Sequence, residues 1–490
     1  MNYRMISYVI GCIWLFEAAF MLVPLITALA YGEQAVFAFL WTALICAGAG
    51  LLLSFRKPKN QTLRARDGFV VVSLSWIAIS LLGSLPFMLT GVTANFVDAL
   101  FETVSGFTTT GATIFGEVES LPRSILMWRS FTHWIGGMGV LVFIMAFVPL
   151  SGGRNMHIMK AESTGPDVGK LVPRVRTTAM LLYSIYLGFT FLQFVLLLFG
   201  KMSVFEALNT AFSTAGTGGF GFKNDSMLSD SPYIQIVVTI YMLLFSINFG
   251  AYFLAFRGKF KDALNGEVRT FLLIVLGAVT LIVISIIANI ASDPVLQAQF
   301  GSADDLGDII RHVAFAVASV VSTTGFSTVD FALWPAVACA ILVLIMFVGA
   351  CAGSTGGGMK VSRIMLLFKG AVRDLRVAIH PKEVRQITVD KKPVGQAVVQ
   401  ATFSYFACFM MVFAVSVMLL AVDGYDFTTN VTAVAATINN IGPGLSGVGP
   451  TCNYAFFSPL SKLVMMFDML VGRLELFPML ILFMPSTWKK

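Results

Sequence analysis

The chain contains 490 residues, of which 57% are hydrophobic and only 12% are charged, whereas soluble domains carry about 25% charged residues. This composition excludes a soluble globular protein and predicts a polytopic membrane protein, because apolar stretches of roughly 20 residues recur along the whole length. The net charge of +7 does not indicate a nucleic-acid partner, since the basic residues gather in loops on one side of the predicted membrane segments.

Ten apolar segments have the length of a membrane helix. The first resembles a signal peptide with a cleavage site at Ala28–Ala30, but its apolar run is too long and Glu17 interrupts it, so we expect a retained helix. The predicted helices are 5–30, 36–55, 69–90, 125–150, 178–199, 232–256, 270–291, 333–350, 397–422 and 460–485.

Lysine and arginine are distributed unevenly between the loops, and this distribution predicts the orientation. The tails and loops that hold 26 of the 33 basic residues are 1–4, 56–67, 151–176, 257–269, 360–392 and 489–490. Such loops stay on the cytoplasmic side, so both termini are expected there. Six other basic residues, among them Arg129 and Lys462, are assigned to the opposite, outer loops, and Arg473 lies inside the last predicted helix.

Four outer regions, around 95–120, 201–230, 293–332 and 423–458, share an unusual pattern. Each contains a mostly uncharged segment of about 10–14 residues, which is too short to span a bilayer but suits a re-entrant half-helix. A stretch rich in Gly, Thr and Asn follows. Non-helical backbone survives at membrane depth only where protein or a water-filled cavity satisfies its polar groups, so the pattern predicts four pore-lining loops.

These four loops align as repeats, and we call them glycine loops 1 to 4. In the first two, an acidic residue, an Ala-Leu pair and a serine coincide without gaps. In the second loop, Gly216 and Gly218 compete with Gly219 for the common glycine position, and the gapless alignment together with the Gly-Phe pair at 219–220 favours Gly219. The common glycines are then Gly111, Gly219, Gly325 and Gly442.

The residue types in these loops indicate a cation filter. A dehydrated cation needs oxygen atoms in place of its hydration shell, and glycine lets backbone carbonyls approach the pore axis closely. The C-terminal ends of four half-helices favour a positive charge, and the lysine or arginine that an anion pore requires is absent from the predicted filter positions. The predicted filter residues are Thr109, Thr110, Gly111, Thr217, Gly218, Gly219, Thr323, Thr324, Gly325, Asn440, Ile441 and Gly442.

A run of small residues follows the eighth predicted helix, within 349–360. The six residues Gly353–Gly358 break any helix. A phosphate-binding loop is excluded, because Met359 separates Gly358 from Lys360 and no strand precedes the run. A small-residue packing face remains the alternative to the reading that we prefer, a flexible intramembrane loop beneath the filter.

Two charged residues within predicted helices need a polar environment. Arg473 is close to Glu475, and a charge at this depth is costly unless it faces a cavity or a partner. A salt bridge that only aids folding is the alternative to our hypothesis that Arg473 faces the pore and holds the closed loop. Glu17 is expected to pack or to form a hydrogen bond between helices.

The sequence resembles the TrkH family of bacterial potassium-uptake proteins, in the superfamily that includes KtrB and the plant HKT transporters, over nearly the whole chain. The resemblance implies an all-α protein of the bacterial inner membrane. By this resemblance each chain surrounds one pore of its own, and two chains assemble as a homodimer. It implies two extra N-terminal helices in 1–67 and four helix, pore-helix, filter and helix repeats in 68–176, 177–269, 270–396 and 397–490.

The resemblance also implies the ion and the gate. Some HKT proteins have serine at the first filter position and prefer sodium, so four glycines favour potassium. The run 349–360 corresponds to the intramembrane gate of the family, and a cytosolic nucleotide-binding ring, TrkA, is the implied regulator. The expected gate residues are Gly353, Ser354, Thr355, Gly356, Gly357, Gly358, Lys360 and Arg473.

We therefore predict a channel-like subunit for potassium uptake, with potassium as the bound ion, lipid around it, and no covalent cofactor or enzymatic activity. A symporter coupled to protons or sodium is the alternative, although buried acids are few: Glu17, Asp468 and Glu475. The basic loops 151–176 and 369–392 are candidate docking surfaces for the ring, and a solvated positive face explains their charge equally well.

Overall fold

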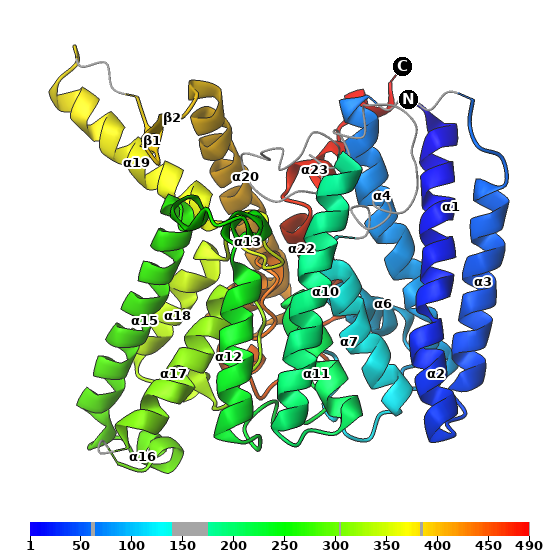
Figure 1. Ribbon diagram of the computed structural model, residues 1–490, viewed down its shortest axis with the longest axis horizontal. Coiled ribbons are helices and arrows are strands. Elements are labelled where there is room, and N and C mark those ends of the chain that lie inside the picture. The colour runs from blue at the N-terminus through cyan, green and yellow to red at the C-terminus, as the bar shows by residue number, and fades with distance from the viewer. Residues whose placement is uncertain (60–63, 140–174, 303–304, 383–385, 490) are drawn as a thin grey trace.

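The computed structural model describes residues 1–59, 64–139, 175–302, 305–382 and 386–489. Helices account for nearly all of the regular structure in these residues, and the long ones run side by side through the molecule (Figure 1). Six of the described helical stretches are long and apolar enough to cross a membrane, and a bent pair adds a seventh if it counts as one crossing. The predicted class, an all-α membrane protein, is therefore confirmed.

The first helices pack closely because two glycines face each other. α1 (Tyr3–Phe20) is followed directly by α2 (Leu22–Tyr31), and α3 (Val36–Ser54) packs along α1. A Cβ atom on Gly11 would lie 2.9 Å from the carbonyl oxygen of Gly50, and a Cβ atom on Gly50 would lie 2.9 Å from that of Gly11. Small residues allow helix backbones in a membrane to approach this closely.

Four short helices correspond to the predicted half-helices: α6 (Phe96–Phe107), α11 (Val204–Gly216), α17 (Leu306–Val321) and α21 (Phe427–Ile438). Each has an acidic residue in or just before its first turn, where the positive end of the helix dipole favours a negative charge. These residues are Asp98, Glu206, Asp308 and Asp426. α17 has 16 residues and is longer than the sequence predicted.

Longer helices precede and follow the short ones along the chain. They are α4 (Ala65–Gly83) with its continuation α5 (Leu85–Leu89), α7 (Arg123–Gly137), α10 (Val175–Phe199), α12 (Pro232–Ser246), α15 (Gly266–Ile290), α18 (Ala336–Val348), α20 (Gln396–Leu420) and α22 (Pro459–Arg473). Most of these bounds agree with the predicted helices to within a few residues. The second half of the predicted helix 125–150 lies outside the described residues.

Two predicted helices are wrong as continuous elements. Within 232–256, α12 is followed by α13 (Phe249–Phe256) at an angle of 93°. The Asn248 side chain caps this new helix by accepting a hydrogen bond from the Gly250 N–H. Within 460–485, α22 stops and α23 (Phe477–Leu482) begins after Glu475 and Leu476, whose φ values are 56° and 66°. A left-handed backbone cannot continue a right-handed helix.

The polar stretch from Lys369 to Gln396 contains structure that the sequence-based helix assignment omits. α19 (Val361–Ile379) enters it, and β1 (Thr388–Val389) pairs with β2 (Lys392–Pro393) as an antiparallel hairpin. We call α19 and this hairpin the α19 unit. The remaining short elements are α14 (Phe260–Ala263), α16 (Pro294–Phe300), α24 (Pro485–Trp488) and the 3₁₀ turns Phe331–Leu333, Ala421–Asp423 and Ser446–Val448.

The two chain ends lie at the same end of the molecule, and the α19 unit projects from that end (Figure 1). α16 lies at the opposite end. The described parts of the two basic tails, residues 1–4 and 489, are thus on one side of the fold, and the charge distribution also predicts one side of the membrane for both tails.

Candidate functional site

The four short helices end in the same backbone turn. A Thr or Asn in the left-handed region follows each helix, and a left-handed Gly comes two residues later. The paired φ values are 58° and 80° for Thr109 and Gly111, 54° and 75° for Thr217 and Gly219, 61° and 85° for Thr323 and Gly325, and 56° and 95° for Asn440 and Gly442. This equivalence makes Gly219, and neither Gly216 nor Gly218, the counterpart of Gly111. Glycine adopts such dihedrals without steric cost.

The glycine loops form a closed ring, and close approach requires glycine at the same four positions. A Cβ atom on Gly111 would lie 1.9 Å from the carbonyl oxygen of Gly218, in the next loop. The corresponding distances are 2.0 Å from Gly219 to Thr324, 2.2 Å from Gly325 to Ile441 and 2.7 Å from Gly442 back to Thr110. Each glycine therefore packs against the residue that precedes the next glycine, in chain order, until the ring closes.

This ring brings backbone carbonyl oxygens of four loops together in a buried place. The side chains of Thr110, Thr324 and Ile441 are fully buried, as are those of the left-handed Thr and Asn residues. Asn440 also donates one hydrogen bond to the Thr110 hydroxyl at 3.0 Å and another to the Met469 carbonyl at 2.9 Å. Rings of carbonyl oxygens are the chemistry that replaces the hydration shell of a monovalent cation.

A cavity of about 110 Å³ opens onto the ring. All four loop glycines line it, together with the segments that leave the loops, such as Ala112–Thr113, Phe220–Gly221 and Pro443. The cavity therefore leaves the ring open on the side where the segments that follow the loops lie.

A buried ion pair supports the ring, and the sequence-based assignment of Arg129 to an outer loop is wrong. Arg129 lies in α7, is 2% exposed, and its Nε atom is 2.7 Å from Glu102 Oε1 on α6. Arg129 also donates to the Thr113 hydroxyl and to the Gly221 carbonyl, each at 3.1 Å. Glu102 accepts a further bond from the Ile114 backbone at 3.0 Å. The available signal was the charge of Glu102 within a mostly uncharged segment.

The assignment of Lys462 to an outer loop is also wrong. Lys462 lies in α22 and is 4% exposed. Its Nζ atom is 2.7 Å from Asp98 Oδ1 in the first turn of α6 and 2.9 Å from the Ala455 carbonyl oxygen. The contact joins the last long helix of the bundle to the first short one, across most of the chain length.

His133 explains the two extra glycines beside loop 2. A Cβ atom on Gly218 would lie 1.8 Å from His133 Nδ1, and one on Gly216 would lie 2.2 Å from the His133 carbonyl oxygen. The imidazole is fully buried and its ring centre is 4.3 Å from that of Phe220. Gly216 and Gly218 are therefore required by packing against α7, whereas Gly219 is required by its φ value and its place in the ring.

The run 349–360 is non-helical between α18 and α19 and lies directly against the ring. The Gly357 N–H donates to the Thr323 hydroxyl at 2.6 Å, and the Gly358 N–H donates to the Asn439 carbonyl at 3.0 Å. Thr355 is fully buried, and its hydroxyl donates to the Phe245 carbonyl at 3.1 Å. We call this segment loop 349–360. It contacts glycine loop 3 at Thr323, and it contacts Asn439, which directly precedes glycine loop 4.

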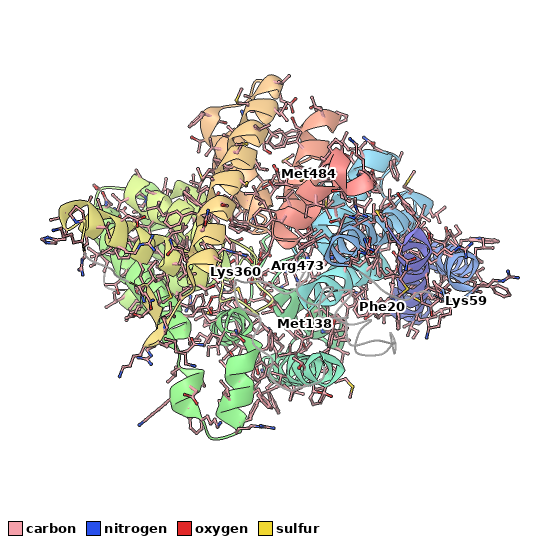
Figure 2. All side chains as sticks on the ribbon, turned by 90° about the horizontal axis from the view of Figure 1, so that it is seen from above. Phe20, Lys59, Met138, Lys360, Arg473 and Met484 are labelled. Carbon is pink, nitrogen blue, oxygen red and sulfur yellow. The ribbon has the colours of Figure 1, made fainter. Side chains whose placement is uncertain are left out.

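Two basic side chains hold loop 349–360. Arg473 donates to the Thr355 carbonyl at 2.8 Å and to the Gly137 carbonyl at 2.6 Å. Lys360 is 1% exposed and its ammonium group donates to the Gly356 carbonyl. Viewed from above, Lys360 and Arg473 lie toward the middle of the helix assembly (Figure 2).

The three acids that the sequence analysis singled out lie in separate places. Glu475 forms an ion pair with Arg363 of α19. Glu17 is fully buried and, among the described residues, neither of its carboxyl oxygens has a hydrogen-bond partner, so the expected hydrogen bond between helices is absent and only the packing role is left. Asp468 accepts a hydrogen bond from the Ser416 hydroxyl at 2.7 Å.

Comparison with known proteins agrees with this architecture. The family model for TrkH, described as a cation transport protein, matches residues 32–490. The Trk system potassium uptake proteins TrkH of Escherichia coli K12 and of Vibrio parahaemolyticus are 34% and 35% identical to the chain, over 100% of both sequences in each case. The crystal structure of the potassium transporter TrkH from Vibrio parahaemolyticus matches with a TM-score of 0.88 and 33% identity, again over 100% of both chains. The chain therefore belongs to the TrkH family of cation transport proteins.

Proposed function

We propose that the protein is the ion-conducting, channel-like subunit of a Trk-type system that takes up potassium across the bacterial inner membrane. The relatives that match over their whole length are potassium uptake proteins. The observation that carries the proposal is the closed ring of glycine loops, in which each glycine packs against the carbonyl that precedes the next glycine. The twelve residues of these loops, from Thr109 to Gly111 and their counterparts, are the proposed potassium filter.

Loop 349–360 is the proposed gate. It lies against the filter through Gly357 and Gly358, and Arg473 ties it to the end of α7 through Thr355 and Gly137. A segment rich in glycine has many accessible conformations once its contacts are released. In the present arrangement these hydrogen bonds hold the loop against the filter, as a closed gate requires.

The face that carries both chain ends and the α19 unit is the proposed cytoplasmic face, because the distribution of lysine and arginine along the chain predicts cytoplasmic termini and a cytoplasmic segment 360–392. The chain contains no nucleotide-binding motif, so we propose that a separate cytosolic nucleotide-binding ring controls the gate and docks on this face. Residues 369–392 are a proposed docking surface; the other predicted surface, 151–176, lies largely outside the described residues. We also propose the homodimer and the division into one extra unit, 1–67, and four pore repeats.

The reversal potential of the purified protein in planar bilayers tests this function. In each experiment a potassium gradient is opposed by a gradient of one other ion, either sodium or protons. A channel gives a reversal potential that follows the potassium gradient alone. A reversal potential that shifts with the proton or sodium gradient at fixed potassium would reject channel-like conduction in favour of coupled transport, and equal responses to sodium and potassium would reject the potassium filter.

A further inference from the structure

One carboxylate oxygen contacts both ends of loop 349–360. Glu267 lies in the first turn of α15, and its Oε1 atom accepts a hydrogen bond from the Ala352 N–H at 2.7 Å and another from the Ser362 N–H at 3.2 Å. Ala352 lies near the start of the loop, and Ser362 lies in the first turn of α19, just beyond its end. A single side chain therefore bridges the two chain segments that enter and leave the proposed gate.

The start of α15 is itself held by the hairpin of the α19 unit. The hairpin turns through Asp390 and Lys391, whose φ values of 49° and 64° are typical of a two-residue hairpin loop. The Asp390 carboxylate accepts hydrogen bonds from the Gly266 N–H at 2.8 Å and 3.0 Å. Gly266 directly precedes Glu267, so the hairpin tip touches the residue next to the bridging carboxylate.

The hairpin and α19 share a small apolar core. Leu366, Ile387 and Val399 form one buried cluster that joins α19, the hairpin and α20. Lys369 of α19 also donates a hydrogen bond to the Thr388 carbonyl at 2.8 Å. The α19 unit thus reaches loop 349–360 by two routes, through the covalent chain at Ser362 and through Asp390, Gly266 and Glu267.

We propose that Glu267 is a positioning residue that holds loop 349–360 closed, and that Asp390 keeps Glu267 in place so that displacement of the α19 unit opens the gate. This inference rests on the proposed function, because it takes loop 349–360 as the gate. Hydrogen bonds to a carboxylate are roughly twice as strong as those between neutral groups. Release of Ala352 and Ser362 from one shared acceptor therefore removes a contact from both ends of the loop at the same time.

The thiol of Cys351 provides a direct measure of loop position. Cys351 precedes Ala352 and is fully buried. In a background in which Cys12, Cys46, Cys339, Cys408 and Cys452 are replaced by alanine, a water-soluble methanethiosulfonate reagent reports only the exposure of this thiol. We expect Glu267→Ala to raise its modification rate about tenfold or more, the scale of losing a hydrogen bond to a charged group. Glu267→Gln retains an acceptor oxygen and is expected to preserve most of the protection.

The hairpin is tested in the same background with a matched control. Asp390→Ala removes the contact with Gly266 and is expected to raise the modification rate of Cys351, together with basal potassium flux in proteoliposomes. Asp262→Ala removes an exposed carboxylate from α14, the helix just before α15, and is expected to change neither quantity. Equal effects of the two substitutions would overturn the role of the hairpin.

Arg473→Ala separates failure of this inference from failure of the proposed gate. If Arg473→Ala raises both flux and Cys351 modification while folded Glu267→Ala and Asp390→Ala change neither, loop 349–360 is the gate but Glu267 does not hold it. If Arg473→Ala raises Cys351 modification without raising flux, the loop moves but is not the gate. Should Glu267→Ala fail to fold, an unchanged Cys351 modification rate in Asp390→Ala is sufficient to overturn the inference.

Discussion

Arg473 donates a hydrogen bond to the carbonyl oxygen of Thr355 at 2.8 Å. Thr355 belongs to the loop beneath the glycine ring, whereas Arg473 closes α22, more than a hundred positions later in the chain. The same guanidinium also donates to Gly137 at the end of α7, where the helix dipole favours a positive charge. Loop 349–360 cannot leave its present place unless the bond between Arg473 and Thr355 breaks.

Replacement of Arg473 by alanine is therefore expected to raise basal potassium flux in the absence of any partner. Loss of a hydrogen bond from a charged donor shifts an equilibrium by about 1.5–3 kcal/mol, so an increase of roughly tenfold or more is expected. Flux is measured as uptake of a potassium tracer into proteoliposomes. Arg473→Lys keeps the charge but lacks the planar fork of donors and should be intermediate. Unchanged flux in folded Arg473→Ala protein would contradict the gating role.

Gly219→Ser is expected to abolish the preference for potassium over sodium. A Cβ atom there would lie 2.0 Å from the Thr324 carbonyl oxygen, and φ is 75°, so both the ring and the backbone must distort. Gly91 is a matched control, because it has the same φ of 75° but no atom within 4 Å of an added Cβ. Gly91→Ser should cost only the left-handed strain, about 1–2 kcal/mol, and keep selectivity. Equal selectivity in the two variants, measured by reversal potentials, would argue against the ring as the filter.

Gly218→Ala is expected to reduce potassium flux, and His133→Ala should partly restore it. The three nearest atoms to a Cβ on Gly218 all belong to the His133 ring, the closest at 1.8 Å. Overpacking of this kind costs about 1–3 kcal/mol, and removal of the imidazole vacates the space. Flux and thermal stability of the two single variants and the double variant form the test. A double variant no better than Gly218→Ala would show that Gly218 is required for another reason.

Arg129→Met is expected to destabilise the protein by about 3–5 kcal/mol, because it leaves the carboxylate of Glu102 buried without its charge partner. The double variant Arg129→Met with Glu102→Met should be less destabilised than the single one, since no lone charge remains buried. Unfolding in detergent followed by tryptophan fluorescence measures both. The pair Arg311 and Asp308, in which Asp308 is 58% exposed, is the control and should contribute less than about 1 kcal/mol.

The backbone features of the candidate site could be predicted because their requirements are local. A half-helix, a polar residue and a glycine two positions later leave a pattern in the sequence, and a left-handed φ is a property of a single residue. The small-residue run before Lys360 is visible for the same reason, since consecutive glycines break a helix wherever they occur. The four loop glycines and the non-helical run 349–360 therefore appear in the structure at the residues where the sequence placed them.

Other predictions were wrong because apolar length does not record a change of direction. The sequence from Pro232 to Phe256 is mostly apolar and uncharged, but Asn248 starts a new helix at 93° to the first. Arg129 and Lys462 were assigned to outer loops because charge alone suggests exposure, whereas each is buried beside a carboxylate from a distant segment. A buried charge is recognisable only together with its partner.

The sequence by itself determined that this is a helical membrane protein with four repeated glycine loops, since composition and backbone requirements are written residue by residue. Only the tertiary structure decided which atoms meet. It placed His133 behind Gly218, Arg473 on the carbonyl of Thr355 and Glu267 between the two ends of the proposed gate. Each of these contacts joins segments that are far apart in the chain, and such contacts arise only when the helices pack.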